Sequence, residues 1–517
     1  METASTTAGR REWVGLAVLV LPVLLISITV TVLYFALPFL SADLKPSGSE
    51  LLWIVDIYAF WLAGLLLVMG TLGDRIGRRR LLLLGAAVFG ITSAAAAYAP
   101  SAEMLIVLRA LQGAAAATLM PSTLALIRNM FHQSRQRRLA IAIWAAGFSG
   151  GSVLGPIVGG WMLERFWWGS VFLINVPIMV LLLVLGPILL PEYRDPRAGR
   201  LDVLSTALSL VAVLPIVYGV KDIAEQGLTP TAALAMAVGL AAGASFIWRQ
   251  RALADPMLDL RLFAERAFGV SLITSTLAIF ALMGLFYFIA QYLQLVLGLR
   301  PFVAGILTLP AAGMALVGSM LAVVVVRWIR PGFVIGGGMF VAGLGFAVLS
   351  QLEGEPGVRT LVIGLGLLGV GLGAVQAVAS DLVIAVAPPE RAGSASAVLE
   401  AGTELGAALG VAVLGSLGLL IYRSTFEVPA DLPGEAAQTT RETLGGAVEV
   451  AAQLSGPAQG ALLQAARTAF TEGMRVAALS GTAVLVATAI LATIQLRRVS
   501  IEEKSPDQAM RDQRSST

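Results

Sequence analysis

The sequence predicts an all-α integral membrane protein, and two observations support that prediction. Of the 517 residues, 57% are hydrophobic and only 13% are charged, against about 45–50% apolar and 25% charged in soluble domains. Polar breaks also divide the chain into about fourteen apolar segments of about 20 residues, the length that crosses the hydrocarbon core of a bilayer. Because a backbone in lipid must satisfy its own hydrogen bonds, each segment is expected to be a helix.

The predicted spans follow one another with mostly short polar connections. They cover residues 13–40, 51–72, 81–98, 104–127, 139–163, 171–190, 201–220, 232–248, 268–290, 303–326, 333–350, 361–386, 395–421 and 476–494. The first is not expected to be a cleavable signal peptide, because its apolar core is too long and no A-x-A site follows it.

The arginines predict which side of the membrane each connection faces. Most of the 35 Lys and Arg residues fall in alternate connections, for example at residues 78–80 and 135–138. Since cytoplasmic loops carry the excess of Lys and Arg, we expect both termini in the cytoplasm and a multi-pass protein of the cell membrane.

Two stretches outside the spans have helical character. Residues 249–267 alternate charge with Leu, Met and Phe, which predicts a short amphipathic helix on the cytoplasmic face. Residues 422–474 hold two Ala-rich stretches separated by Pro/Gly breaks, which predicts an extracellular helical hairpin.

The composition excludes several classes of function. With no cysteine and one histidine, the chain offers no cluster of ligands for zinc, copper or an iron–sulfur centre. No nucleophile–base arrangement is evident, so we predict that the protein is not an enzyme. We expect no nucleic-acid partner.

The lysines bear on the source of energy. A P-loop pump needs G-x-x-x-x-G-K-[ST], but none of the three lysines, Lys45, Lys221 and Lys504, follows a glycine. Unless a partner subunit hydrolyses ATP or the protein is a passive channel, transport must use an ion gradient. We therefore expect no cofactor and a proton gradient as the driving force.

The stretch GTLGDRIGRRR, residues 70–80, connects the second and third spans. Its candidate gate residues on the cytoplasmic side are Gly70, Gly73, Asp74, Arg75, Gly77 and Arg78. The glycines permit a tight turn, and the charged side chains can cap a helix or form ion pairs. A plain positively charged loop is the alternative. The spacing resembles the signature loop of the major facilitator superfamily, which implies two six-helix bundles that rock about a central site.

In the fifth span, GSVLGPIVGG places Gly151, Gly155 and Gly159 on one helix face, where a neighbouring backbone can approach closely. Pro156 removes a backbone hydrogen bond and permits a bend, and Gly160 completes a glycine pair. Small-residue packing alone would explain the glycines. The form with proline and paired glycine resembles the antiporter motif of major-facilitator exporters.

Further stretches resemble one subfamily, the fourteen-helix drug:proton antiporter family of QacA- and LfrA-like multidrug exporters. They are LWIVDIY at 52–58, FLINVP at 172–177, DPMLDLRLF at 255–263 and the long connection before the last span.

The resemblance implies a domain organisation and a substrate class. It implies a six-helix bundle at residues 1–190, two inserted helices with the amphipathic segment at 191–267, a second bundle at 268–496 and a cytoplasmic tail at 497–517. It also implies proton-coupled export of lipophilic organic cations such as quaternary ammonium biocides, ethidium-like dyes and, in some members, fluoroquinolones.

Four charged residues lie well inside predicted spans, away from the span ends, where a charge is costly and usually functional. Asp56 interrupts an apolar run in the second span, and Glu400 and Glu404 lie one turn apart on the same face of the thirteenth. A carboxylate there can take a proton or face a cation, so the two compete for one site. The alternatives are an interfacial Asp56 and a structural hydrogen bond for the glutamates. Arg109, in RALQGAAAA, either snorkels to the surface or resembles the family's fourth-helix arginine associated with proton coupling.

The chain departs from the family at two positions. QacA-like sequences have an acid nine residues before the proline of the ALP motif, where this chain has Thr29, and Ala315 replaces an acid of QacA in the tenth span. Arg109 therefore lacks its usual first-helix partner. We expect Asp56, at similar depth, to replace it as the partner of Arg109.

Deep aromatic side chains are candidates for a substrate pocket, since ring faces attract organic cations. They are Tyr58, Trp61, Trp144, Phe286 and Tyr287. Core or lipid-facing packing is the alternative for each.

The sequence thus predicts a proton-coupled multidrug exporter that acts as a monomer, with lipophilic cations, protons and membrane lipids as its partners. A dedicated exporter of one endogenous metabolite or antibiotic would have almost the same sequence. A non-transporting receptor or scaffold on the same fold would have no need of ionisable groups inside its helices.

Overall fold

The computed structural model describes residues 8–194, 202–253, 256–258, 260–352, 357–386, 392–428 and 432–497. Throughout these ranges the regular structure is helical. The elements are α1 (Arg10–Leu44), α2 (Gly48–Ile76), α3 (Arg78–Ala97), α4 (Ala102–Met130), α5 (Ser134–Arg165), α6 (Ser170–Leu173), α7 (Asn175–Leu189), α8 (Val203–Gln226), α9 (Pro230–Ala252), η1 (Leu260–Ala264), α10 (Arg266–Gln291), η2 (Tyr292–Val296), α11 (Pro301–Val325), α12 (Pro331–Leu349), α13 (Val358–Val386), α14 (Ala392–Thr425), α15 (Gly434–Glu442), α16 (Leu444–Gln453) and α17 (Pro457–Leu496).

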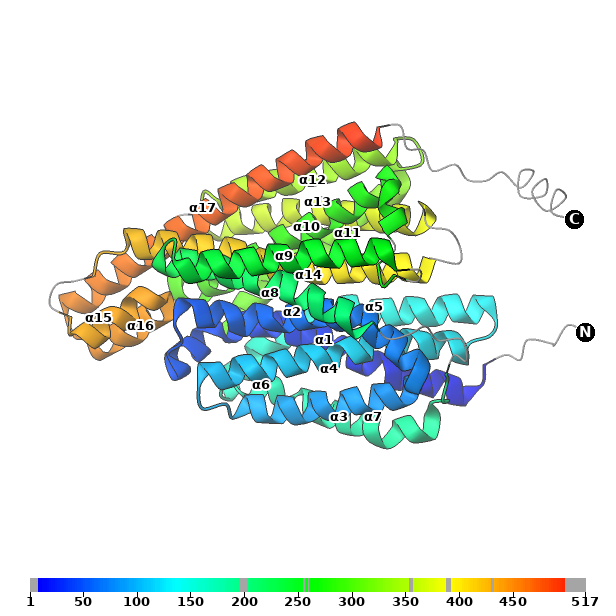
Figure 1. The fold of residues 1–517 in the computed structure, drawn as a ribbon. Coiled ribbons are helices and arrows are strands. Elements are labelled where there is room, and N and C mark those ends of the chain that lie inside the picture. Colours follow the sequence, from blue (N-terminus) through cyan, green and yellow to red (C-terminus); the bar gives the residue numbers. More distant parts are fainter. Residues whose placement is uncertain are drawn as a thin grey trace, which may run out of the picture.

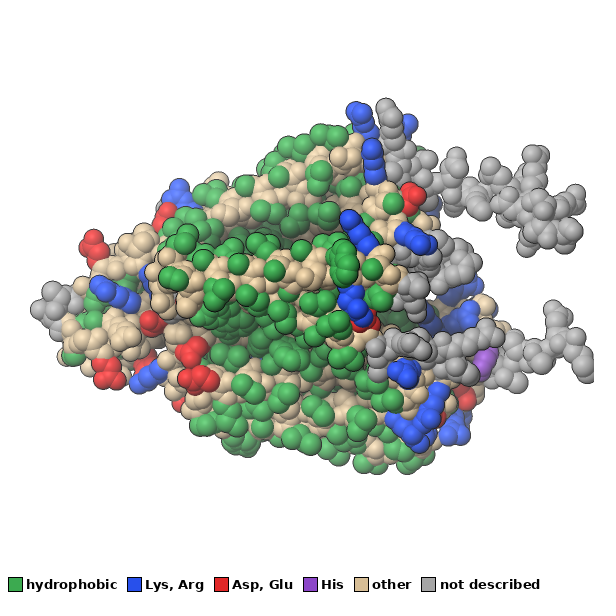
Figure 2. Space-filling model, viewed as in Figure 1, with side chains coloured by type: hydrophobic (Ala, Val, Ile, Leu, Met, Phe, Trp, Pro, Cys, Tyr) green, Lys and Arg blue, Asp and Glu red, His purple; other side chains and the backbone are tan. Residues whose placement is uncertain are grey.

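The predicted number of spans is confirmed: 14 helical stretches in the described ranges are long and apolar enough to cross a membrane. Figure 2 shows a broad band of hydrophobic side chains around the middle of the molecule, with charged side chains gathered at its two ends. Large apolar side chains such as Ile91, Trp248 and Met320 are more than two-thirds exposed. Their exposure fits a surface that faces lipid.

Two six-helix halves with matching packing flank an inserted helix pair, as predicted. In the first half α1 packs against α5 and α2 against α4; in the second, α10 packs against α14 and α11 against α13. The inserted helices α8 and α9 pack on each other, and α8 contacts both α2 and α14 (Figure 1). The domain limits at residues 190, 267 and 496 stay predictions, and residues 498–517 of the tail lie outside the described residues.

The molecule has two distinct ends. The start of α1 and the end of α17 lie at one end, here called the terminal end, and α15 and α16 project from the opposite end, here called the hairpin end (Figure 1). The halves meet through α2 with α14 and through α5 with α11. On α5, Gly151, Gly155, Gly159 and Gly160 are buried, whereas most of residues 134–150, nearer the terminal end, are not. The halves are therefore closed together at the hairpin end.

The structure corrects two local predictions. The amphipathic helix expected over residues 249–267 is instead the last turn of α9, which continues to Ala252, followed by the short 3₁₀ helix η1. The expected two-helix hairpin over 422–474 consists of α15, α16 and the first part of α17, which starts at Pro457 and continues unbroken through the last span. A polar surface does not by itself end a helix, so sequence polarity misplaced these limits.

Candidate functional site

Asp56 lies just over two turns inside α2, whose start is set by a capping box. The Ser47 hydroxyl accepts a hydrogen bond from the Glu50 amide, and the Glu50 carboxylate accepts one from the Ser47 amide. From that start the helix carries Asp56 into the bundle, where its side chain is fully enclosed.

The partner of Asp56 is Lys221 of the inserted helix α8. Lys221 Nζ donates a hydrogen bond of 2.9 Å to Oδ1 of Asp56 and lies 2.7 Å from Oδ2. Nζ is also 3.6 Å from the ring centroid of Trp53, one turn before Asp56. The two charged side chains are 1% and 0% exposed, so a carboxylate and an aromatic face hold an ammonium group out of water.

The predicted pairing of Asp56 with Arg109 is wrong. Arg109 Nε donates to the carbonyl of Ile54 (3.2 Å), Nη1 donates to Oε1 of Gln112 (3.1 Å), and the guanidinium lies 4.5 Å from the ring centroid of Tyr58. No ion pair with a carboxylate is formed by Arg109 within the described ranges. The sequence does not place Lys221 in the membrane, because the predicted seventh span ends at Val220, whereas α8 continues to Gln226.

A chain of buried polar side chains connects Arg109 to Thr29. The Gln112 amide donates to Oγ of Ser93 (3.0 Å), Asn175 donates to the same Oγ (3.4 Å), and Thr29 donates to Oδ1 of Asn175 (3.0 Å). All five side chains are at most 1% exposed. Thr29, at the position where QacA-like sequences have an acid, therefore reaches Arg109 through neutral groups from three other helices. Nothing in the sequence distinguished Ser93, Gln112 and Asn175 from ordinary packing residues.

Glu400 and Glu404 differ from Asp56 in having half-buried side chains, and no ion pair to either is found in the described part of the chain. Glu404 lies within electrostatic range of Tyr34 and Tyr58, and Tyr34 also interacts with Asp56 and Arg109. Charged groups of α2, α4 and α14 therefore all act on Tyr34 of α1.

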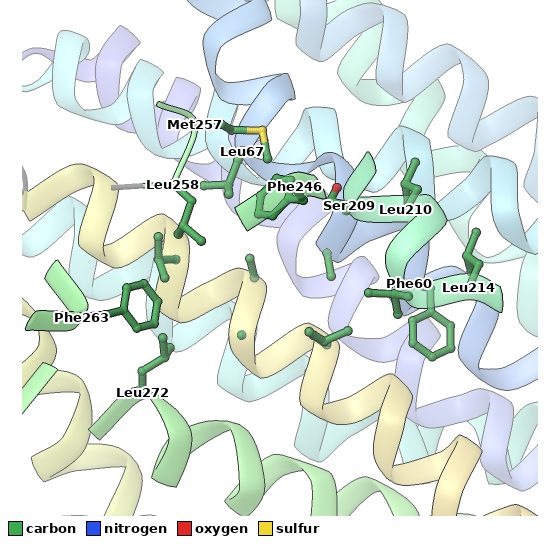
Figure 3. A pocket seen from close by; sticks show the side chains of 17 residues that line it. Phe60, Leu67, Ser209, Leu210, Leu214, Phe246, Met257, Leu258, Phe263 and Leu272 are labelled. Atoms are coloured by element: carbon green, nitrogen blue, oxygen red, sulfur yellow. The ribbon is translucent and has the colours of Figure 1, made fainter. Parts of the chain in front are cut away.

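A cavity of about 220 Å³ lies beside these acids, between α2, α8 and α14 (Figure 3). Phe60 of α2 and Leu405 of α14 line it, one turn from Asp56 and next to Glu404, and Ser209 of α8 supplies its hydroxyl. Phe246 and Phe263 add ring faces from α9 and η1. The inserted helices thus form one wall of an apolar chamber next to the charged site.

The five aromatic residues predicted for a pocket do not line this cavity. Tyr58 and Tyr287 are buried, Phe286 packs edge-on against Tyr34 at 5.8 Å, and Trp144 donates from Nε1 to the Thr123 hydroxyl (3.1 Å). Trp61 packs half-buried against the core. Tyr58 contacts Arg109, and Phe286 contacts Tyr34, so these two remain close to the charged site.

The loop between α2 and α3 forms a compact ionic cluster at the terminal end. Arg78 donates from Nε to Oδ1 of Asp74 (2.7 Å), and Glu192 accepts the backbone amide of Arg79 (3.1 Å). Gly77 has φ +115°, a backbone conformation that favours glycine. Arg75 is exposed, Gly73 packs against the side chain of Arg78, and Gly70 has no neighbour where a Cβ would point.

The glycines of α5 pack against two helices at once. A Cβ at Gly151, Gly155 or Gly159 would overlap α1, at Leu24, Thr31 and Val32 respectively. A Cβ at Gly160 would lie 2.5 Å from the Pro301 carbonyl of α11, and one at Gly305 of α11 would overlap the Pro156 carbonyl. This glycine motif therefore lies where the two halves close at the hairpin end.

The family assignment follows from the sequence comparison. The model of the Major Facilitator Superfamily matches residues 19–411. The chain belongs to the Major Facilitator Superfamily. It is therefore a multi-pass membrane transporter and not an enzyme.

Similar members of the superfamily are drug-resistance proteins. The chain is 47% identical to the multidrug efflux pump LfrA of Mycolicibacterium smegmatis, over 96% of this chain and 99% of that protein. It is 36% identical to the methyl viologen resistance protein SmvA of Salmonella typhimurium, over 93% and 97% of the two chains. It is 31% identical to the tetracenomycin C resistance and export protein of Streptomyces glaucescens, over 96% and 94%. These relatives support drug efflux.

Solved superfamily structures share the fold. A bacterial homologue of the human lysosomal transporter Spinster, in an inward-facing and unoccupied conformation, superposes with a TM-score of 0.68 at 17% identity, covering 95% of this chain and 98% of that one.

Ala315, the second departure from QacA, lies at a close crossing of α11 and α13. A Cβ at Gly373 of α13 would lie 2.7 and 2.8 Å from backbone atoms of Ala315.

Proposed function

We propose that the protein is a proton-coupled antiporter that exports lipophilic organic cations by alternating access. One observation carries the proposal: two carboxylates from opposite halves, Asp56 on α2 and Glu404 on α14, lie on helices that pack against each other, beside the cavity that Phe60 and Leu405 line. A rocking motion of the halves changes the surroundings of both acids together, which is what the exchange of a proton for a cation requires.

The chemistry needs only the carboxylates and a gradient. At Glu404, which forms no ion pair among the described residues, the acid is neutral with a proton and anionic with a cation beside it, so a bound proton and a bound cation exclude each other. Return of protons down their gradient then drives the cation outward. Arg109 holds the tyrosine ring next to these acids and keeps a fixed positive charge near them.

The orientation in the membrane belongs to the same proposal. Lys and Arg side chains gather at the terminal end (Figure 2), and cytoplasmic surfaces carry this excess. The terminal end then faces the cytoplasm, with both chain ends there, and the hairpin end faces outward. Closure at the hairpin end then corresponds to a state that takes up substrate from the inside, and we propose that the monomer is the working unit.

The substrate class rests on the site and on the relatives. The cavity beside the acids is lined mainly by carbon and aromatic rings, which suits a lipophilic body with a positive charge. Methyl viologen, in the name of one relative, is such a cation. Quaternary ammonium biocides, ethidium-like dyes and fluoroquinolones are the compounds to test.

Inside-out vesicles test the proposal directly. Vesicles energised to an acidic lumen and loaded with an acridine dye should lose quenching when ethidium is added, because protons leave as ethidium enters. Glu404→Gln should abolish this response, whereas the control Glu103→Gln, at an exposed position on α4, should retain it. Absence of a response to ethidium and to several other organic cations would overturn the assignment.

A dedicated exporter of one antibiotic is the second candidate, favoured by relatives named for single compounds such as tetracenomycin C and puromycin. The two functions separate in the same assay. A dedicated exporter responds to one chemical scaffold, whereas the proposed exporter responds to unrelated cations.

A further inference from the structure

Lys221 is a positively charged side chain of the protein itself, and it is bound to Asp56, the acid that the proposed function assigns to transport. Its ammonium group contacts the carboxylate of Asp56 and the aromatic face of Trp53. Carboxylates and aromatic faces are the two kinds of group that bind an organic cation. A substrate cation that uses Asp56 must therefore displace or neutralise Lys221.

Charge balance decides between these two outcomes. The pair has no net charge, and its side chains are sealed from water. Adding one monovalent cation would leave a net positive charge in a site of low dielectric, which is strongly unfavourable. Neutrality returns when one proton leaves, and a buried lysine can lose its proton where an arginine cannot.

We propose that Lys221 carries an exchangeable proton: a monovalent organic cation takes the carboxylate of Asp56 as the ammonium of Lys221 releases one proton. In this step one N–H bond of the ammonium breaks, its electron pair stays on Nζ, and the proton passes to water once the rocking of the halves has opened the site. One positive charge enters and one leaves, so the carboxylate stays ionised throughout. The inference rests on the proposed function and adds the inserted helix α8 to its machinery.

Few other ionisable groups face Lys221. Tyr34 of α1 and Tyr287 of α10 lie within electrostatic range of Asp56. The α14 side of α8 is apolar where Ala408 and Ala412 pack with Val217, one turn before Lys221.

The other charged side chains of α8 and α9 that the structure describes do not pair with Lys221. Asp222, next along α8, accepts hydrogen bonds from the hydroxyls of Thr229 and Thr231 at the turn into α9. From its start at Pro230, α9 carries no acidic or basic side chain before Arg249, at its far end. Asp56 is thus the only carboxylate among the described residues that forms an ion pair with Lys221.

Two substitutions distinguish proton exchange from a structural ion pair. Arginine at this position keeps the pair with Asp56 but stays charged, so Lys221→Arg should block exchange. Methionine removes the ammonium, and Asp56 can then take the proton itself as a neutral acid, so Lys221→Met should keep cation-driven proton release. A purely structural pair predicts the reverse order, because methionine leaves a buried carboxylate unpaired and arginine does not.

The experiment uses the full chain reconstituted in liposomes, with tetraphenylphosphonium as the probe and a trapped pH dye as the readout. Lys221→Arg should lower tetraphenylphosphonium-driven proton release by about tenfold or more, and Lys221→Met should remain close to wild type. Lys45→Arg is the matched control, since Lys45 is an exposed lysine paired with Glu449 at the hairpin end. Near-normal release in Lys221→Arg, or loss confined to Lys221→Met, would overturn the inference.

If the single variants do not fold, a third variant still tests the inference. Asp56→Asn/Lys221→Met removes both charges and so avoids a stranded one; it should fold and lose most of the coupled release, and retained release would overturn the inference. The two levels of the proposal also separate. No proton release by the wild type with any cation contradicts the antiporter function itself, whereas release by both wild type and Lys221→Arg contradicts only the role of Lys221.

Discussion

Asp56 and Glu404 are carboxylates on neighbouring helices, α2 and α14, and their surroundings differ sharply. Asp56 is sealed and paired with an ammonium group at 2.7–2.9 Å. Glu404 is half-buried, and in the described part of the chain no cation pairs with it. Residue type and depth in the membrane therefore do not decide whether a carboxylate is held in an ion pair. An available counter-charge and a path to water decide it.

The largest expected effect comes from removing one partner of the sealed pair. Asp56→Ala leaves Lys221 as a buried unpaired cation, which should lower the free energy of unfolding by about 3–5 kcal/mol. Glu404→Ala leaves no charge behind and should cost less than about 1 kcal/mol. Thermal unfolding of both variants in the same detergent checks the contrast. Equal losses would show that the two acids have the same structural role.

The second prediction concerns the contact between the two halves at the hairpin end. This contact holds the halves together around the sealed pair of Asp56 and Lys221. Gly160→Val places atoms against the backbone of Pro301 and Phe302 in the other half, a strain of about 1–3 kcal/mol that opening of this end relieves. We expect the halves to separate there. Gly150→Val is the control, since nothing lies within 4 Å of its Cβ position on the same helix.

The chain has no cysteine, so spin labels can be attached through two introduced ones. Phe166→Cys and Val303→Cys lie at exposed positions on opposite halves. The distance distribution between the labels should shift to longer values in Gly160→Val. Identical distributions in Gly160→Val and Gly150→Val would contradict the expectation.

A smaller effect is expected from the polar chain that supports Arg109 beside Asp56. Thr29→Val removes the donor to Oδ1 of Asn175 and should destabilise the protein by about 1 kcal/mol, because a buried acceptor loses its partner. Thr31→Val on the same helix is the control, since the Thr31 hydroxyl only bonds carbonyls of its own helix. Chemical denaturation measures both. A cost for Thr31→Val as large as for Thr29→Val would argue against a special role of the chain.

The smallest effect concerns the other end of α8, where a partly exposed ion pair contrasts with the sealed one. Burial by itself would raise the pKa of Asp202, but hydrogen bonds from Ser205 and the Arg249 guanidinium outweigh it and hold that pKa below its ordinary value. The stabilisation is therefore present above the ordinary aspartate pKa of about 3.9 and is lost as the pH falls through the lower pKa of the folded state.

Hydrogen exchange of α8 and α9 across this acidic range measures the effect. Protection should fall on acidification in the wild type and change less in Asp202→Asn, which has no charge to lose. A parallel loss in both proteins would assign the acid sensitivity to another group.

Much of the architecture follows from the sequence, because each span carries its own signal. The run from Leu51 to Met69 is apolar enough to be a membrane helix whatever its neighbours are, and the glycines of 151–160 mark a close helix contact before any partner is known. Polar surface segments were less predictable. Residues 457–474 are predicted to belong to a separate hairpin, yet they form one helix with the last span.

The sequence by itself determined the membrane class, the number of spans, the family and the presence of Asp56, Arg109 and Glu404 inside helices, because hydrophobicity and motif spacing are local properties. Only the tertiary structure decided that Asp56 pairs with Lys221, 165 residues away, and that Arg109 reaches Thr29 through neutral side chains. Partners across a bundle depend on helix rotation and exact helix ends. A shift of a few residues at the end of α8 separates a lysine in water from one buried against a carboxylate.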